Sequence, residues 1–117
     1  MDKSLKRTIL IVEDVAEISS QMSAMLRGKG HQVLLASDAT EAFEIAKRNR
    51  PTIVLTDLDL PTLTLLVRLI REHQDLKEMP IAIIDINGPV IRKELSLNVL
   101  SDFEEMDKLI QSAQLAR

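Results

Sequence analysis

The 117-residue chain contains no cysteine, and this absence excludes several kinds of chemistry. Without thiol groups there are no disulfide bonds, no thiolate metal ligands and no cysteine nucleophile. Histidine is scarce as well, because His31 and His73 are the only two imidazoles in the chain. His31 follows two glycines and His73 ends a segment of mixed charge. We therefore interpret both as surface residues and not as ligands or bases.

Aromatic residues are scarce, and the chain has neither an excess of positive charge nor a long apolar run. Two phenylalanines are too few for a base-stacking platform. A formal net charge of -3 argues against a surface for nucleic-acid backbone. The longest apolar runs, Ile9–Val12 and Ile81–Ile84, are too short to cross a bilayer, and the charged start leads into no signal-peptide core. We therefore expect a cytoplasmic protein without direct contacts to nucleic acid or membrane.

The length of the chain predicts one domain. A domain of this size buries roughly 65–70% of the surface that its unfolded chain exposes, so its core needs no covalent staple. We find no internal repeat, low-complexity segment or flexible linker. Residues 1–117 are therefore expected to form a single domain.

Short apolar segments alternate with segments of helical periodicity along the chain. Strands are expected at residues 8–12, 33–36, 53–55 and 81–84, and at 99–100. Helices are expected at about 16–27, after the capping residue Asp38, near 65–73 and after Asp102, while 90–97 reads as a short helix or a loop. This alternation predicts βαβ units and a parallel sheet, with helices covering both faces of strands that are apolar throughout.

Acidic residues follow three of the expected strands. Glu13 and Asp14 end the first, Asp57 and Asp59 follow the third, and Asp85 follows the fourth. If these strands are neighbours, the carboxylates converge and repel each other, which a magnesium ion would relieve. An aspartate beside bound magnesium can also act as a nucleophile towards phosphorus. Alternatively, these acids cap helices or lie in solvated loops, and for Asp85 this reading is the stronger one.

Two segments resemble the receiver domain of two-component response regulators. They are Ile9–Asp14, which ends in the acidic pair, and Pro51–Pro61, in which Asp57 precedes a proline at the family's spacing. The resemblance covers nearly the whole chain and implies a flavodoxin-like α/β fold. Its sheet is a doubly wound, five-stranded parallel sheet with strand order 2-1-3-4-5 and helices on both faces. Two shortened segments imply a reduced loop at 62–64 and a fourth helix that is short or missing.

The resemblance also implies roles for the acidic residues. Asp57 would be the phosphoryl acceptor, and Asp14 would hold Mg²⁺ together with Glu13, which acts through water. Asp57 and the backbone carbonyl of Asp59 would complete the protein's share of the metal ligands. The cation would offset charge on the phosphoryl oxygens. A histidine kinase or another signalling protein would be the partner.

The chain departs from the family at the residues that read out phosphorylation. A serine or threonine normally ends the fourth strand, but Asp85 stands there, and an ionised carboxylate is an acceptor only. The aromatic residue of the fifth strand aligns with Asn98, and the lysine and proline that follow align with Ser101 and Asp102. We therefore predict an atypical, degenerate receiver that is not an enzyme. It would keep the phosphoacceptor and magnesium acids, lack the usual switch residues and act through protein–protein interaction.

Two alternatives stay open. The chain could be a docking or dimerisation module that works without phosphorylation, with a homodimer as one form. A phosphatase of the haloacid dehalogenase type fits less well. Asp57 and Asp59 resemble the paired aspartates of that family, but Pro61 stands where it has a threonine.

Overall fold

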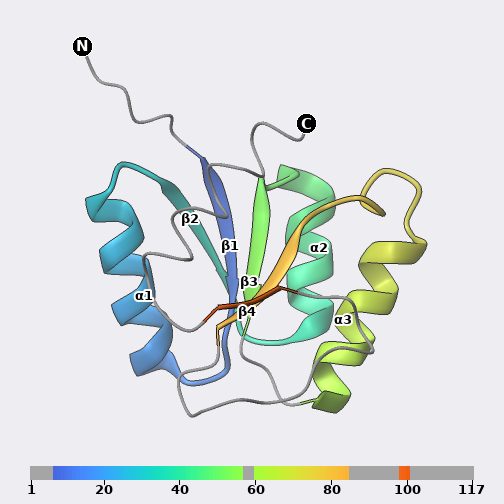
Figure 1. Ribbon diagram of the computed structural model, residues 1–117, viewed down its shortest axis with the longest axis horizontal. Coiled ribbons are helices and arrows are strands. Elements are labelled where there is room, and N and C mark those ends of the chain that lie inside the picture. The colour runs from blue at the N-terminus through green and yellow to red at the C-terminus, as the bar shows by residue number, and fades with distance from the viewer. Residues whose placement is uncertain (1–6, 57–59, 85–97, 101–117) are drawn as a thin grey trace.

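The computed structural model describes residues 7–56, 60–84 and 98–100 (Figure 1). The described residues form a five-stranded sheet in the order β2-β1-β3-β4-β5, together with helices α1 to α3. The strands are β1 (Thr8–Val12), β2 (Gln32–Ala36), β3 (Ile53–Thr56), β4 (Ile81–Ile84) and β5 (Asn98–Leu100). The helices are α1 (Ala16–Gly28), α2 (Ala39–Asn49) and α3 (Leu60–Glu72). The predicted doubly wound, parallel topology is confirmed.

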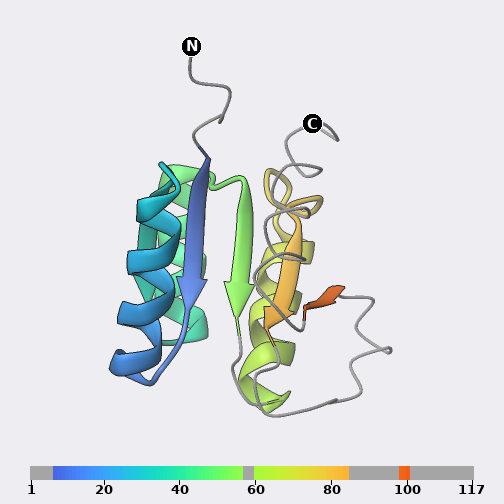
Figure 2. The same cartoon turned by 60° about the vertical axis from the view of Figure 1, so that its left-hand side comes forward.

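The strands are parallel throughout, and their carboxyl ends lie level with each other. Val12 at the end of β1 pairs with Ala36 on β2 and with Thr56 on β3. Thr56 in turn pairs with Ile83 on β4. Figure 2 shows the arrowheads of β1, β3 and β4 pointing the same way. The segments that leave these strands therefore start from one edge of the sheet.

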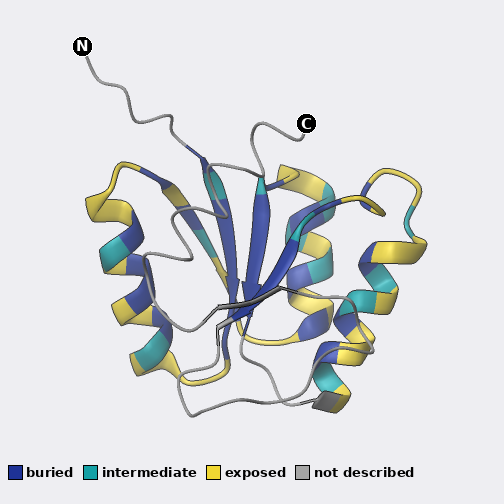
Figure 3. Ribbon diagram, viewed as in Figure 1, coloured by how far each residue is buried: buried dark blue, intermediate teal, exposed yellow. Residues whose placement is uncertain are grey.

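Helices cover both faces of the sheet because its central strands are apolar on both sides. On one face, Met22 and Leu26 of α1 join a buried cluster with Ile9 and Ile11 of β1. On the other face, α2 and α3 pack over the alternate residues of β1 and β3 in a larger buried cluster. Figure 3 shows the central strands buried and the outer faces of the helices exposed. Helix α1 thus turns Met22 and Leu26 towards the sheet.

The ends of α2 follow the sequence signals closely. Asp38 is the N-cap, and its Oδ1 accepts a hydrogen bond from the Glu41 N–H at 2.8 Å. Glu41 reaches back in return, but its Oε1 accepts from the N–H of Ser37, one residue before the cap, at 2.7 Å. At the other end Arg50 adopts a left-handed conformation with φ of 45° just before Pro51. Asp38 therefore caps the helix as predicted, and the helix ends at Asn49, shortly before Pro51.

Helix α3 begins earlier than the sequence indicated. It starts at Leu60, so residues 62–64, which we expected to form a loop, belong to the helix. Pro61 is compatible with a first helical turn because the N–H that it lacks would have no partner there. Leu63, Leu66 and Ile70 are buried at helical spacing, and this apolar stripe explains why the helix extends to Leu60.

The prediction that His31 is a surface residue was wrong. Gly30 turns the chain back with φ of 92°, and His31 is only 6% exposed beside the start of β1. Its Nδ1 accepts a hydrogen bond from the backbone N–H of Arg7 at 3.3 Å. His73 is half-buried just beyond α3, where its ring meets the edge of Phe43 at a centroid distance of 5.7 Å.

Strand β2 lies at the end of the strand order and has β1 as its neighbour. The N–H of Gln32 and the carbonyl of Ala36 both bond towards β1, so the peptide groups of Val33 face the other way. The guanidinium of Arg27, on α1, donates from Nη2 to the carbonyl of Val33 at 3.3 Å. Helix α1 is thus tied to the outer edge of β2 as well as to its face.

Several expectations fall outside the described residues. They are the helix after Asp102, the segment 90–97 and the fourth helix that was expected to be short or missing. Among the helices that the structure describes, none is long and apolar enough to cross a membrane.

Candidate functional site

Two neighbouring acids occupy the turn between β1 and α1, and their environments differ. Glu13 is buried, with 4% of its surface exposed, whereas Asp14 is exposed. The backbone N–H of Glu13 donates to the carbonyl of Ala36 on β2 at 3.0 Å. Its side-chain Oε2 accepts from the N–H of Val15 at 2.9 Å. Glu13 is therefore held on both sides, and Asp14 presents its carboxylate to solvent.

The start of α1 explains why Glu13 turns inward. Val15 is the N-cap residue of this helix and has an extended backbone, and its apolar side chain makes no capping hydrogen bond. Its carbonyl accepts the first helical bond from the N–H of Ser19 at 3.0 Å. Glu13, two residues upstream, supplies the acceptor for the N–H of Val15 itself. Glu13 therefore contributes a hydrogen bond to the turn, in addition to the negative charge of the acidic pair.

The structure places two of the four residues predicted for the metal site. Glu13 and Asp14 follow β1, whose last residue, Val12, pairs with Thr56 at the end of β3. Asp57 is the next residue in the chain after Thr56, but Asp57 and Asp59 lie outside the described residues. Within the ranges that are described, no three histidine, aspartate or glutamate side chains gather as a metal-binding group.

The positions predicted for the switch residues are described only in part. Asn98 is the first residue of β5 and pairs with Ala82, while Leu100 pairs with Ile84. Asp85 and Ser101 follow those two paired residues in the chain and are outside the described part. Because Ile84 pairs with Leu100, Asp85 and Ser101 follow the last residues of two neighbouring strands, β4 and β5.

A hollow of about 280 Å³ lies beside the acidic turn, on its β2 side. Sequence reasoning did not find it, although Glu13, Asp14 and Ser37 follow the ends of β1 and β2, which is the signal that could have shown it. The Glu41 carboxylate in this hollow is already hydrogen-bonded, since it accepts from the backbone N–H and the hydroxyl of Ser37. The hollow is lined by Glu13, Asp14, Ala16, Ser19, Ser20, Leu35, Ala36, Ser37 and Glu41.

The chain belongs to the response regulator receiver domain family, whose model matches residues 9–102. This match covers β1 from Ile9 onward, the acidic turn and the other four strands. The chain is therefore a receiver domain of two-component signalling, as the sequence motifs predicted.

Solved receiver structures share the whole fold. The receiver domain of the sensor histidine kinase PA1611 from Pseudomonas aeruginosa is 27% identical, with a TM-score of 0.79 over 92% of this chain and 97% of that one. That structure holds a magnesium ion coordinated in its active-site cleft. A putative response regulator from Chloroflexus aurantiacus is also 27% identical, with a TM-score of 0.80 over 97% of this chain and 100% of that one.

Curated relatives match over about half of the chain. The DNA-binding response regulator MtrA of Mycobacterium bovis is 34% identical over 58 residues, which are 50% of this chain and 25% of MtrA. Protein PilH of Pseudomonas aeruginosa is 38% identical over 55 residues, or 47% of this chain and 46% of PilH. The matched part is thus less than half of either relative.

Proposed function

We propose that this chain is an atypical receiver that accepts a phosphoryl group on Asp57 beside a bound magnesium ion. The observation that carries the proposal is the pairing of Val12 with Thr56. This pairing starts the two acidic segments from the same edge of the sheet, and Asp14 is exposed there. Ligands of open α/β sheets bind outside the carboxyl ends of the strands.

The donor set fits a magnesium ion. Asp14 and Asp57 would contribute carboxylate oxygens and Asp59 its backbone carbonyl, with Glu13 beside them, and Mg²⁺ favours such hard oxygen donors. The exposure of Asp14 supports this fit. When bound, the ion would offset negative charge on the phosphoryl oxygens. The magnesium in the PA1611 receiver domain supports the same choice of ion.

The chemistry of the chain itself lies on Asp57. One of its carboxylate oxygens would attack phosphorus, forming an acyl phosphate while the bond from phosphorus to the donor breaks. The donor would be a histidine kinase or another signalling protein. In this role the single domain of residues 1–117 is a signalling module and not an enzyme.

The replaced switch residues set how the signal is used. Asp85 is acceptor-only, Asn98 carries no aromatic ring, and Ser101 has no positive charge. A new charge shifts a fold only when some element binds the charged state better than the uncharged one. We therefore propose that the domain acts through protein–protein contacts that phosphorylation changes locally and not through a global switch.

Intact mass after incubation with Mg²⁺ and acetyl phosphate tests the proposal. We expect one phosphoryl adduct on the wild type and none on Asp57→Asn. Asp75→Asn is the matched control, because Asp75 is an exposed aspartate beyond α3 that pairs with Arg50, and it should keep the adduct. The same adduct on Asp57→Asn would refute the assignment of the acceptor.

The second candidate is a docking or dimerisation module that works without phosphorylation, which the loss of the switch residues favours. It predicts neither an adduct nor a change of melting temperature when Mg²⁺ is added. Hydrolysis of a generic phosphate ester would instead support a phosphatase of the haloacid dehalogenase type.

A further inference from the structure

The burial of Glu13 suggests a role other than the water-mediated metal contact that the resemblance implies. Its side chain is 4% exposed, while Asp14, the next residue, is exposed. A buried carboxylate is costly unless hydrogen bonds compensate it. Here Oε2 accepts from the N–H of Val15 at 2.9 Å, so Glu13 is engaged with the backbone of its own turn.

This hydrogen bond spans Asp14. On the near side, the N–H of Glu13 is fixed to Ala36 of β2 at 3.0 Å. On the far side, Val15 is fixed through its N–H by Glu13 and through its carbonyl by Ser19, at 3.0 Å. Both peptide neighbours of Asp14 are thus held in place. Groups that orient a metal ligand in this way contribute to metal affinity without touching the metal.

We infer that Glu13 is a positioning residue whose carboxylate fixes the β1–α1 turn and thereby the place of the Asp14 carboxylate. The inference rests on the proposed cation site, because it assigns the contact with the ion to Asp14. It replaces the water-mediated contact of Glu13 as the main contribution of that residue.

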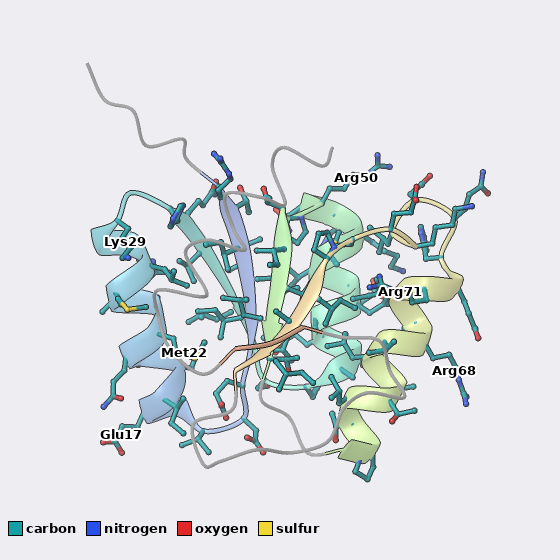
Figure 4. The ribbon with its side chains drawn as sticks, in the orientation of Figure 1. Glu17, Met22, Lys29, Arg50, Arg68 and Arg71 are labelled. Atoms are coloured by element: carbon teal, nitrogen blue, oxygen red, sulfur yellow. The ribbon has the colours of Figure 1, made fainter. Side chains whose placement is uncertain are left out.

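Two substitutions separate the hydrogen bond from the charge. Glu13→Gln and Glu13→Ala remove the same negative charge, but the amide oxygen of glutamine can still accept from the Val15 N–H and alanine cannot. Glu13→Met is a second acceptor-free variant of similar size in case the alanine variant does not fold. Glu17→Gln is the matched charge control, because Glu17 is exposed in the first turn of α1 and points away from the sheet (Figure 4).

The probe is Mg²⁺ alone, titrated into ¹⁵N-labelled protein and followed by NMR. We expect Glu13→Ala to bind Mg²⁺ at least roughly tenfold more weakly than Glu13→Gln, the loss typical of groups that orient a ligand. Glu17→Gln should bind like the wild type. Equal affinities of the glutamine and alanine variants would overturn the inference, because loss of charge would then explain the whole effect.

Hydrogen exchange of the Val15 amide gives a readout that needs no metal. The amide should be protected in the wild type and in Glu13→Gln, and should exchange at least roughly tenfold faster in Glu13→Ala or Glu13→Met. If the wild type binds no Mg²⁺, the proposed cation site fails and Val15 exchange alone decides. Protection lost without the acceptor then supports the part of the inference that Glu13 fixes the turn, and unchanged protection overturns it.

Discussion

Neighbouring side chains on one helix differ greatly in what they contribute. On α3, Leu66 is completely buried in the core below β1 and β3, whereas Leu65 is 42% exposed. Leucine to alanine in a packed core costs the transfer free energy of the lost atoms and leaves a cavity. A half-exposed leucine loses less transfer free energy, and its removal leaves no enclosed cavity.

We expect Leu66→Ala to lower the free energy of unfolding by about 2–5 kcal/mol. The matched change Leu65→Ala should stay within about 1 kcal/mol, as surface substitutions usually do. Urea denaturation followed by circular dichroism measures both values. Similar losses for the two variants would mean that α3 does not present the face to the core that the structure shows.

The residues that the sequence predicted best are those whose role is local. Asp38 caps α2 because its short carboxylate reaches an N–H three residues ahead, and this depends on spacing alone. Glu13 and His31 could not be read in this way. His31 accepts from Arg7, which is 24 residues away in the chain, and spacing does not encode that contact. The bond from Val15 to Glu13 spans two residues, but the burial of Glu13 depends on how the turn packs against the sheet.

At the scale of elements, the end of α2 stores some backbone strain. Arg50 has φ of 45°, in the left-handed region that residues with a Cβ atom rarely adopt. Its N–H donates to the carbonyl of Ala46 at 2.8 Å, a bond that any residue could make. Its ion pair with Asp75 is exposed on both sides and contributes little.

Arg50→Gly should therefore raise the free energy of unfolding by about 0.5–1 kcal/mol, because glycine adopts this conformation without steric cost. The control is Arg48→Gly, in the last turn of the same helix, which should lower it by about 0.5–1 kcal/mol. Thermal unfolding followed by calorimetry tests both. A destabilised Arg50→Gly variant would show that the arginine side chain outweighs the strain.

The bounds of an element were predicted well where its apolar pattern is unambiguous. They were predicted poorly at the start of α3, where a loop was expected. The four-residue apolar strand β4 has the predicted bounds, because nothing competes with its pattern. The family resemblance misled at residues 62–64, because it implied a loop where the buried stripe of Leu63, Leu66 and Ile70 belongs to one helix. For the site, the sequence located the acids at strand ends. The register of β1 against β3, which starts the two acidic segments from one edge of the sheet, is not stated by the motifs alone.

At the scale of the whole molecule, we expect phosphorylation to remain a local event. Beryllofluoride with Mg²⁺ imitates a phosphoryl group on an aspartate. Amide NMR shifts should be confined to the turns that follow β1 and β3, because we propose that Asp85, Asn98 and Ser101 cannot do the work of the family's switch residues. Asp57→Asn with the same additions is the control and should show no beryllofluoride shifts. Shifts that reach residues 102–113 would contradict the loss of the switch.

The hydrogen bond from Arg27 to Val33 bears on how copies of the molecule behave towards each other. The outer edge of β2 offers backbone donors and acceptors to any extended strand from another molecule, and Leu35, on that strand, is 41% exposed. Arg27 bonds to the carbonyl of Val33, so this acceptor is already engaged when another strand approaches. An approaching strand would also have to strip water from the Arg27 guanidinium, which costs free energy. A single side chain of α1 thereby helps to keep the sheet from growing beyond its own molecule.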